Sequence, residues 1–293
     1  MRKPFFYILL LFVAFPALFI SCNSEEDDEN TEILYEVSII AEEGGSVQFS
    51  DYSGLTRQVK FGTGVKVIAT PDEGWAFLGW YMNGVILVKP TASFAFPAIT
   101  DMQLTAKFEK IPAYEAVDLG LSVKWATFNV GASRPERCGC YYAWGETEEK
   151  DIYSEENYLY YSNGSYTDIG SNIAGTQYDV AHVKWGGDWR MPTSDELYEL
   201  RNNCDWEWTA IDGINGCKVK SRVNDEFIFL PASGYRRDTE IYGLSNSYVG
   251  AYLSSVLGNS YYAYNLRLRE NACYIDQSDR SSGLTVRPVI EKK

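Results

Sequence analysis

The fold of the amino-terminal third of the chain is decided by the stretch WAFLGWYMNG at residues 75–84. Residues 75–82 are mostly apolar, and their aromatic side chains favour a β-strand. The Asn83-Gly84 pair that follows is a strong signal for a two-residue hairpin turn, because both residues adopt positive φ at little cost. The stretch therefore predicts a strand that reverses direction at residue 83.

The residues around this stretch repeat the same pattern of short strands and turns. Alternating apolar residues predict further strands at 35–40, 46–49, 65–69, 93–96 and 103–108. Gly44-Gly45 and the segment 71–74 supply turn residues between them. No helical periodicity of useful length occurs here, so residues 34–110 are predicted to form a small all-β module.

Four motifs of this module recur in a recognisable order. They are GGSV at 44–47, ATPDEGW at 69–75, FLGWY at 77–81 and LTAKFE at 104–109. Together they resemble the divergent internalin-type B-repeat of bacterial surface proteins. The resemblance implies a spacer or adhesive element rather than a catalyst, with the Trp and Phe side chains packing a small core.

The first 21 residues have the organisation of a secretory signal peptide. Arg2 and Lys3 precede an apolar run at 5–20, which ends in Ser21 and Cys22. The run is shorter than the roughly 20 residues of a membrane-spanning helix, so cleavage is favoured over a retained anchor. The segment resembles a lipobox, which implies lipidation of Cys22 and an anchor in the membrane made of several acyl chains.

Residues 22–33 are predicted to form a lipidated acidic linker. The run EEDDEN at 25–30 resembles the signal that sends lipoproteins of Bacteroidetes-type bacteria to the outer surface of the outer membrane. A solvated spacer would have the same composition, and both interpretations can hold together. The expected location is the outer membrane, lipid-anchored and exposed on the cell surface.

Composition limits the partners of the mature protein. The 293 residues are 45% hydrophobic and carry a formal net charge of -14, so a folded chain of two domains is expected. The charge becomes more negative when Arg2 and Lys3 leave with the signal peptide. Such a balance argues against nucleic acid and against anionic lipid surfaces as partners.

After a linker predicted at 111–116, the motifs of the first module end and a second domain is predicted at 117–293. Four motifs follow in order over residues 117–293: YYAWGET at 141–147, YDVAHVKWGGDWRMPT at 178–193, FLPASGYR at 229–236 and TVRPV at 285–289. They resemble the Fibrobacter succinogenes major paralogous domain of surface proteins. WRMPT and TVRPV also look like parts of formylglycine-generating enzymes, which implies a C-type-lectin-like α+β fold. The fold class expected for the chain is therefore α+β, with a small all-β module first.

One helix of this second domain is predicted from physical chemistry alone. Thr193 and Glu196 form a capping box, in which each side chain bonds to the backbone N–H of the other residue. Leu197, Leu200 and Cys204 follow at helical spacing and give the helix one buried face. Alternating apolar residues predict strands at 227–230, 248–254, 261–269 and 284–289.

The chain does not present a complete catalytic set, so we expect no enzyme activity, no metal and no cofactor. Formylglycine-generating enzymes use a cysteine pair near their carboxyl end, and here only Cys273 lies in the corresponding region. His182 is the single histidine, and we expect it to be a buried, hydrogen-bonded core residue. An extracytoplasmic enzyme of the formylglycine-generating lineage or a carbohydrate-active enzyme remains the alternative. A structural subunit of a surface assembly is a further one.

The cysteine positions do not determine a disulfide pattern. Once Cys22 is lipidated, an odd number remains, at positions 138, 140, 204, 217 and 273. Cys204 and Cys217 are possible disulfide partners, although sequence alone leaves the connectivity open. With one histidine in the chain, a closed zinc site is not expected.

Binding is the function class that the sequence favours most. The segment 157–166 is polar, rich in turn residues and dense in tyrosine, which predicts a surface loop. Its candidate ligand-binding residues are Tyr158, Tyr160, Tyr161 and Tyr166. Such rings stack on sugars or seed protein interfaces, so the expected partner is a glycan or an extracellular protein. The alternative is that the tyrosines fold back on their own domain.

Two further sets of residues have types that could contact a ligand. Trp206 and Trp208 alternate, which is typical of strand packing. A calcium site would need clustered oxygen ligands, and acidic residues occur at 151, 155, 156, 276 and 279 without a recognisable ligand spacing.

Overall fold

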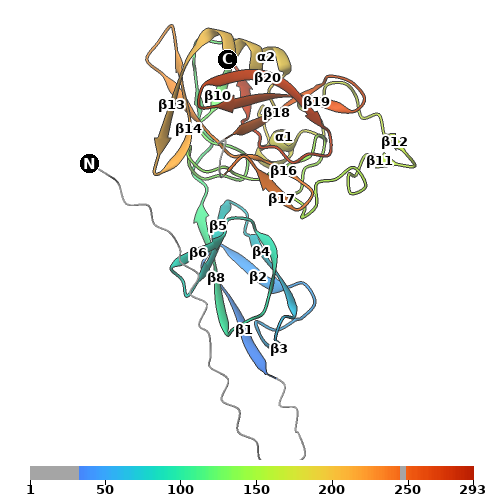
Figure 1. Cartoon of the computed structure of the whole chain (residues 1–293). Helices are drawn as coiled ribbons and strands as arrows, with labels where there is room; N and C mark the ends of the chain where they lie inside the picture. Colours follow the sequence, from blue (N-terminus) through green and yellow to red (C-terminus); the bar gives the residue numbers. More distant parts are fainter. Residues whose placement is uncertain (1–32, 245–248) are drawn as a thin grey trace, which may run out of the picture. The chain divides into compact units, whose positions relative to one another are not determined.

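Strands dominate the part of the chain that the computed structural model describes, residues 33–244 and 249–293 (Figure 1). In these residues the helices are α1 (Val180–Trp185) and α2 (Ser194–Asn203). Strands account for 49% of the residues and helices for 6%. The expectation of an α+β chain with a C-type-lectin-like α+β domain is therefore wrong, because segments without a clear strand pattern also form sheets.

The amino-terminal module is built from two sheets. The first has the order β3-β1-β8-β5-β6, with β1 and β8 parallel and the other pairs antiparallel. Its strands are β1 (Leu34–Ala41), β3 (Thr56–Lys60), β5 (Trp75–Met82), β6 (Ile86–Lys89) and β8 (Met102–Lys110). The second has the order β2-β4-β7. Its strands are β2 (Gly45–Phe49), β4 (Gly64–Pro71) and β7 (Ser93–Pro97). Buried apolar side chains of both sheets form one core, with Trp80 fully enclosed.

The hairpin predicted from residues 75–84 is confirmed. Strand β5 turns at Asn83 and Gly84, whose φ angles are 49° and 69°, and pairs with β6. The N–H of Val85 donates to the carbonyl of Met82 at 3.1 Å, which closes the turn. Gly79 sits at a bulge with φ of 150°, where any Cβ would collide with Leu87. Only glycine fits this point of the strand.

The carboxy-terminal region contains three small sheets and two hairpins. The sheet orders are β21-β10-β9, β13-β14-β15 and β18-β19-β20, and the hairpins are β11-β12 and β16-β17. The strands of the first sheet are β9 (Ala116–Val117), β10 (Val123–Ala126) and β21 (Val289–Glu291). Those of the second are β13 (Cys204–Ile211), β14 (Ile214–Ser221) and β15 (Phe227–Pro231). Those of the third are β18 (Gly250–Leu257), β19 (Tyr262–Arg269) and β20 (Ala272–Asp279). The hairpin strands are β11 (Tyr161–Ser162), β12 (Ser165–Tyr166), β16 (Tyr235–Arg237) and β17 (Glu240–Tyr242).

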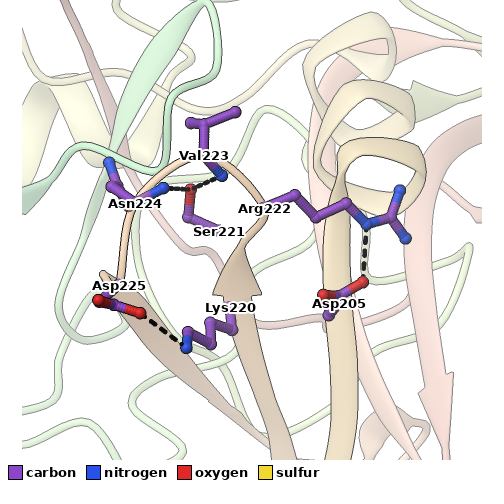
Figure 2. Close-up of a pocket in the computed structure, with 7 residues that line it drawn as sticks. All are labelled: Asp205, Lys220, Ser221, Arg222, Val223, Asn224 and Asp225. Carbon is purple, nitrogen blue, oxygen red and sulfur yellow. Dashed lines mark hydrogen bonds and ion pairs between the residues drawn. The ribbon is translucent and has the colours of Figure 1, made fainter.

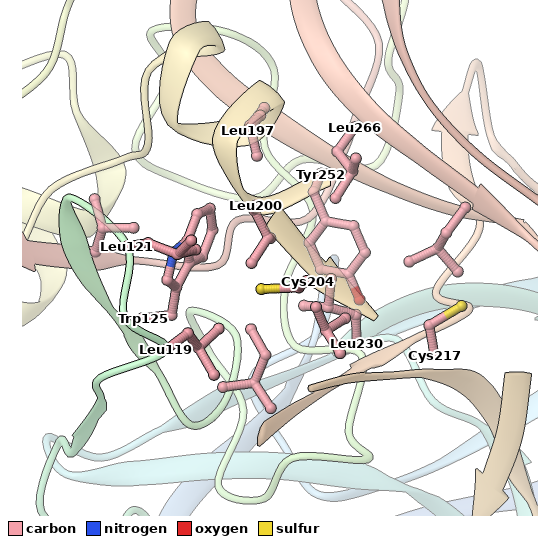
Figure 3. Packing of buried hydrophobic residues seen from close by; sticks show 14 of the residues in the cluster. Leu119, Leu121, Trp125, Leu197, Leu200, Cys204, Cys217, Leu230, Tyr252 and Leu266 are labelled. Carbon is pink, nitrogen blue, oxygen red and sulfur yellow. The ribbon is translucent and has the colours of Figure 1, made fainter. Parts of the chain in front are cut away.

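Helix α2 covers part of the largest core of this region (Figure 3). The capping box is present: the Thr193 hydroxyl accepts from the Glu196 N–H at 3.2 Å, and the Glu196 carboxylate accepts from the Thr193 N–H at 2.7 Å. Leu197, Leu200 and Cys204 are each fully buried. The helix start and its buried face are thus confirmed.

The buried apolar residues of the chain fall into separate clusters. One cluster lies within residues 37–108, and the other three lie within residues 119–289. In the described residues, every sheet lies wholly before or wholly after the segment 111–115. Domain boundaries at 34–110 and 117–293 remain a prediction.

Asp179 organises the polypeptide around α1. Its carboxylate is fully buried and accepts four backbone N–H groups at 2.8–3.1 Å, from Gly175, Ala181, His182 and Met191. These donors belong to the loop before α1, to the first turn of α1 and to the chain that leads into α2. One side chain therefore caps a helix and joins three segments.

We expect Asp179→Asn to lower the free energy of unfolding by about 3 kcal/mol, because the amide replaces one acceptor oxygen by a donor and leaves buried N–H groups unpaired. Urea unfolding followed by tryptophan fluorescence measures the change. The control is Asp188→Asn, which alters an exposed carboxylate paired with Lys293 and should cost less than about 1 kcal/mol. Equal unfolding midpoints for the two variants would contradict this role of Asp179.

Candidate functional site

The tyrosine-dense segment is a hairpin rather than an irregular loop. Strands β11 and β12 are joined by Asn163 and Gly164, whose φ angles are 50° and 76°. Tyr161 and Tyr166 lie opposite each other, with ring centroids 5.0 Å apart. The Asn-Gly pair is the signal that would have predicted this turn from sequence.

Six tyrosine rings form a continuous row, which we call the tyrosine strip. Neighbouring rings of the strip have centroids 5.0–5.9 Å apart, mostly edge to face. The members are Tyr158, Tyr160, Tyr161, Tyr166, Tyr178 and Tyr261. The fold thus brings three distant segments of sequence into one aromatic surface.

Exposure differs along the strip. Tyr158 is only 2% exposed, and its hydroxyl donates to the carbonyl of Trp144 at 2.5 Å. Tyr261 is 59% exposed, while the rest of the strip is half-buried. Of the candidate binding residues, Tyr158 therefore belongs to the interior, and Tyr160, Tyr161 and Tyr166 keep part of their surface open. Tyr178 and Tyr261 join them, and the sequence did not point to either.

Arg280 fixes the strip from behind. Its guanidinium carbon lies 4.9–5.4 Å from the ring centroids of Trp144, Tyr158 and Tyr166, a cation–π arrangement on three sides. It also donates to the Tyr158 hydroxyl at 3.2 Å and to the Thr167 carbonyl at 3.3 Å. Arg280 is 2% exposed, so these contacts replace water around a buried cation.

The hydroxyl groups of the strip act as hydrogen-bond donors. Burial raises the pKa of Tyr158 and of Tyr166, and the Glu155 carboxylate raises that of Tyr166 further. The Tyr166 hydroxyl donates to Glu155 at 2.6 Å. The protons of the Tyr158 and Tyr166 hydroxyls are therefore committed to internal acceptors, and the part of the strip that stays open is mainly ring surface.

Four of the five acidic residues at 151, 155, 156, 276 and 279 have a cationic or hydroxyl partner, and that of Asp151 is Lys66. Glu155 accepts from Tyr166, Asp279 pairs with Arg237, and Asp276 lies 3.5 Å from Arg267. The described residues hold no group of three or more His, Cys, Asp or Glu side chains arranged to bind a metal ion.

A shallow polar depression lies where β14 turns into β15 (Figure 2). Its charged groups neutralise each other, since Arg222 pairs with Asp205 at 2.7 Å and Lys220 with Asp225 at 3.0 Å. The Ser221 hydroxyl donates to the Leu119 carbonyl at 2.8 Å and accepts from two backbone N–H groups of the turn. That hydroxyl is thus committed to holding the turn.

The cysteines of the described residues are all free thiols. Cys204 faces Ser221 across the β13-β14 ladder, whereas Cys217 faces Trp208, so the two lie four positions apart along the ladder. That offset of about 13 Å is too long for a disulfide between them. Burial raises the pKa of Cys204 to about 11 and that of Cys273 to about 12. These thiols therefore stay protonated at neutral pH.

The remaining residues that the sequence analysis singled out, Trp206, Trp208 and His182, lie in a strand or a helix. Trp206 and Trp208 lie on β13 and pack half-buried on the core, as predicted. His182 is in the last turn of α1 and is half-buried, so it is less enclosed than expected. Cys22 lies outside the described residues. Among the residues that are described, none of the helices has the length and apolar character needed to cross a membrane.

Comparison with known proteins identifies one part of the chain. Residues 35–112 match the family model of the divergent InlB B-repeat domain. The match covers the two sheets β1–β8 and supports the resemblance seen in the sequence. Searches of curated proteins and of solved structures gave no match to the chain.

We expect Arg280→Met to loosen the tyrosine hairpin, because the thioether retains length but loses the hydrogen bonds and the charge over the rings. Backbone amides at 158–167 should exchange with deuterium at least about tenfold faster, while those of β5 stay unchanged. Arg237→Met, which removes a more exposed ion pair, is the matched control. Unchanged exchange at 158–167 would show that Arg280 does not hold the hairpin.

Burial also predicts slow chemistry at the core thiols. Native protein should react with iodoacetamide at Cys204 and Cys217 only at the rate of unfolding, because both are buried and carry raised pKa values. Peptide mass analysis after timed alkylation measures this. Rapid modification of either residue in folded protein would contradict the packing described for the core.

Proposed function

We propose that the chain is a lipid-anchored protein of the bacterial cell surface that binds a glycan or an extracellular protein through the tyrosine strip. The observation that carries the proposal is the match of residues 35–112 to the divergent InlB B-repeat domain, a surface-type repeat module. Such a module is compatible with an adhesion-like role. In this proposal it supports the carboxy-terminal region, which makes the specific contact.

The chemistry of the strip supports the binding role. Tyrosine buries a large flat ring at a small cost in side-chain entropy and keeps a hydroxyl for hydrogen bonding, which suits both sugars and protein surfaces. Arg280 and Glu155 hold the rings before any ligand arrives. Binding to a preformed surface loses less entropy than binding to a flexible loop.

The anchor gives the binding region its location. Lipidation of Cys22 would tether the module to the outer membrane through several acyl chains, which together give stable attachment. The acidic run at 25–30 would then direct the protein to the outer face. The whole protein would present the tyrosine strip to molecules outside the cell.

A non-catalytic role is part of this proposal. The side chains that could act as nucleophiles are used in the structure or are unreactive. The Ser221 hydroxyl holds a turn, and burial raises the pKa of the Cys204 and Cys217 thiols. His182 lies on a short helix whose N-terminus is capped by the buried Asp179. These positions favour packing over acid–base chemistry.

Glycan and protein arrays test the binding role directly. The mature chain from residue 22, carrying Cys22→Ser for solubility, is applied to host glycans, plant glycans and extracellular matrix proteins. Tyr161→Ala combined with Tyr261→Ala should lower affinity at least about tenfold, because stacked rings supply much of the contact energy. Tyr198→Ala combined with Tyr242→Ala removes rings of comparable exposure outside the strip and should leave affinity unchanged.

Two outcomes would contradict the proposal. Binding that survives loss of Tyr161 and Tyr261 would place the contact elsewhere on the chain. The second is that the chain binds none of the glycan and protein probes, although its unfolding curve shows that it is folded. That result would contradict a binding function.

A further inference from the structure

Three large apolar side chains are exposed together at one end of the amino-terminal module, and we call this surface the apolar end. Leu34, Phe61 and Ile99 are 50%, 66% and 55% exposed. Leu34 begins β1, Phe61 directly follows β3, and Ile99 lies in the segment between β7 and β8. A cluster of this kind on a small module indicates a contact surface rather than scattered exposed residues.

The pairing of the strands explains why these residues meet. Strand β1 lies between β3 and β8, and Leu34 is opposite Lys60, the residue before Phe61. The parallel pairing of β1 with β8 begins at Val37 and Met102, and Leu34 and Ile99 each lie three residues before this pair. The Gly62 N–H also donates to the Ala98 carbonyl at 2.7 Å, which joins the Phe61 turn to the Ile99 segment.

Two contacts connect the apolar end to the residues around it. The Phe61 ring lies 6.2 Å from the ring of the half-buried Tyr35, which supports it from the core side. Beside Leu34, the Asp101 carboxylate accepts the Glu36 N–H at 2.8 Å and fixes the adjoining strand ends. These contacts involve the Phe61 ring and the backbone beside Leu34.

The position of the apolar end in the chain identifies what covers it. The end includes the start of β1, the first strand that follows Cys22 in the sequence. Eleven residues separate Cys22 from Leu34, and they span at most about 40 Å when fully extended. A lipid on Cys22 would thus keep this end of the module within reach of the membrane, a step that rests on the anchor in the proposed function.

We propose that the apolar end inserts into the interface of the membrane that holds the anchor. Phenylalanine, leucine and isoleucine side chains enter the boundary between headgroups and acyl chains readily. The charges beside the end are of both signs, with Lys60 on β3 and Glu36 and Asp101 on the other side. A membrane of zwitterionic lipids fits this surface, because it requires no net positive charge on the protein.

Membrane insertion orients the module as well as retaining it. Acyl chains on Cys22 would hold the protein at the membrane without fixing the direction of the module. Contact through Leu34, Phe61 and Ile99 would place the ends of β1, β3 and β8 at the membrane and direct the rest of the module away from it.

Vesicle binding of the unlipidated chain tests the insertion separately from lipidation. The mature chain with Cys22→Ser is sedimented with phosphatidylethanolamine–phosphatidylcholine vesicles. We expect measurable binding that falls at least about tenfold in the Phe61→Ser, Ile99→Ser double variant. The control is Val223→Ser with Phe227→Ser, which removes side chains that are 75% and 46% exposed at the β14-β15 turn, outside the amino-terminal module, and should leave binding unchanged.

A second measurement locates the contact in the anchored protein. In lipidated chain reconstituted into the same vesicles, amides at 60–62 and 98–101 should exchange more slowly than in the detergent-free Cys22→Ser chain alone. Mass analysis of the amino-terminal peptide reports lipidation independently, so a chain without lipid would count against the proposed anchor and not against the apolar end.

Three results would overturn the inference. The first is vesicle binding that is absent or equal in the two double variants. The second is an absence of protection at 60–62 and 98–101 in the lipidated, reconstituted chain. The third is a concentration-dependent dimer in sedimentation velocity that the Phe61→Ser, Ile99→Ser variant abolishes, because a second copy would then cover the same surface.

Discussion

The buried carboxylate of Asp179 is the constraint on which the carboxy-terminal region most depends. Four backbone N–H groups converge on it from the loop at Gly175, from α1 and from Met191. A charge removed from water is tolerated only with such complete hydrogen bonding. Tyr178, at one end of the tyrosine strip, directly precedes Asp179, and the capped helix α2 follows Met191 by three residues. The same contacts that satisfy the carboxylate therefore position both the strip and the helix that covers the core.

Two buried arginine cations also stabilise the carboxy-terminal region. Arg280 is enclosed by three aromatic rings, and Arg287 donates to Asn129 and to the carbonyls of Ala126, Thr127 and Phe229. Burial lowers the pKa of Arg287 to about 10, yet the group remains charged at neutral pH. Carbonyl oxygens and ring faces thus replace carboxylates as partners. Arg280 thereby holds the tyrosine strip from its buried side, which in the proposed binding role would lower the entropy lost on binding.

Local signals predicted the parts of the fold that local chemistry controls. Asn83-Gly84 and the Thr193–Glu196 capping box each specify a short backbone geometry, and both were found where the sequence placed them. The fold class was wrong because it was inferred from the resemblance to C-type-lectin-like domains, although the alternation of polar and apolar residues in β13 and in part of β14 is typical of strands. Two turn signals, Asn163-Gly164 and Asp212-Gly213, were present in the sequence and would have revealed two of the hairpins. The contacts of Arg280 and the contact between the rings of Tyr261 and Tyr166 join residues that are far apart in the sequence. Patterns of neighbouring residues do not predict such contacts.

In the proposed function, a surface-type module carries a tyrosine strip that would be exposed outside the cell. The most direct test of this proposal is labelling of intact cells with a biotin–phenol reagent and peroxidase added outside, followed by mass analysis of the modified tyrosines. Tyr261, which is 59% exposed, should be labelled on intact cells, whereas Tyr158, at 2%, should remain unmodified. Labelling of Tyr261 only after the outer membrane has been permeabilised would place the protein on the periplasmic side and contradict the central claim.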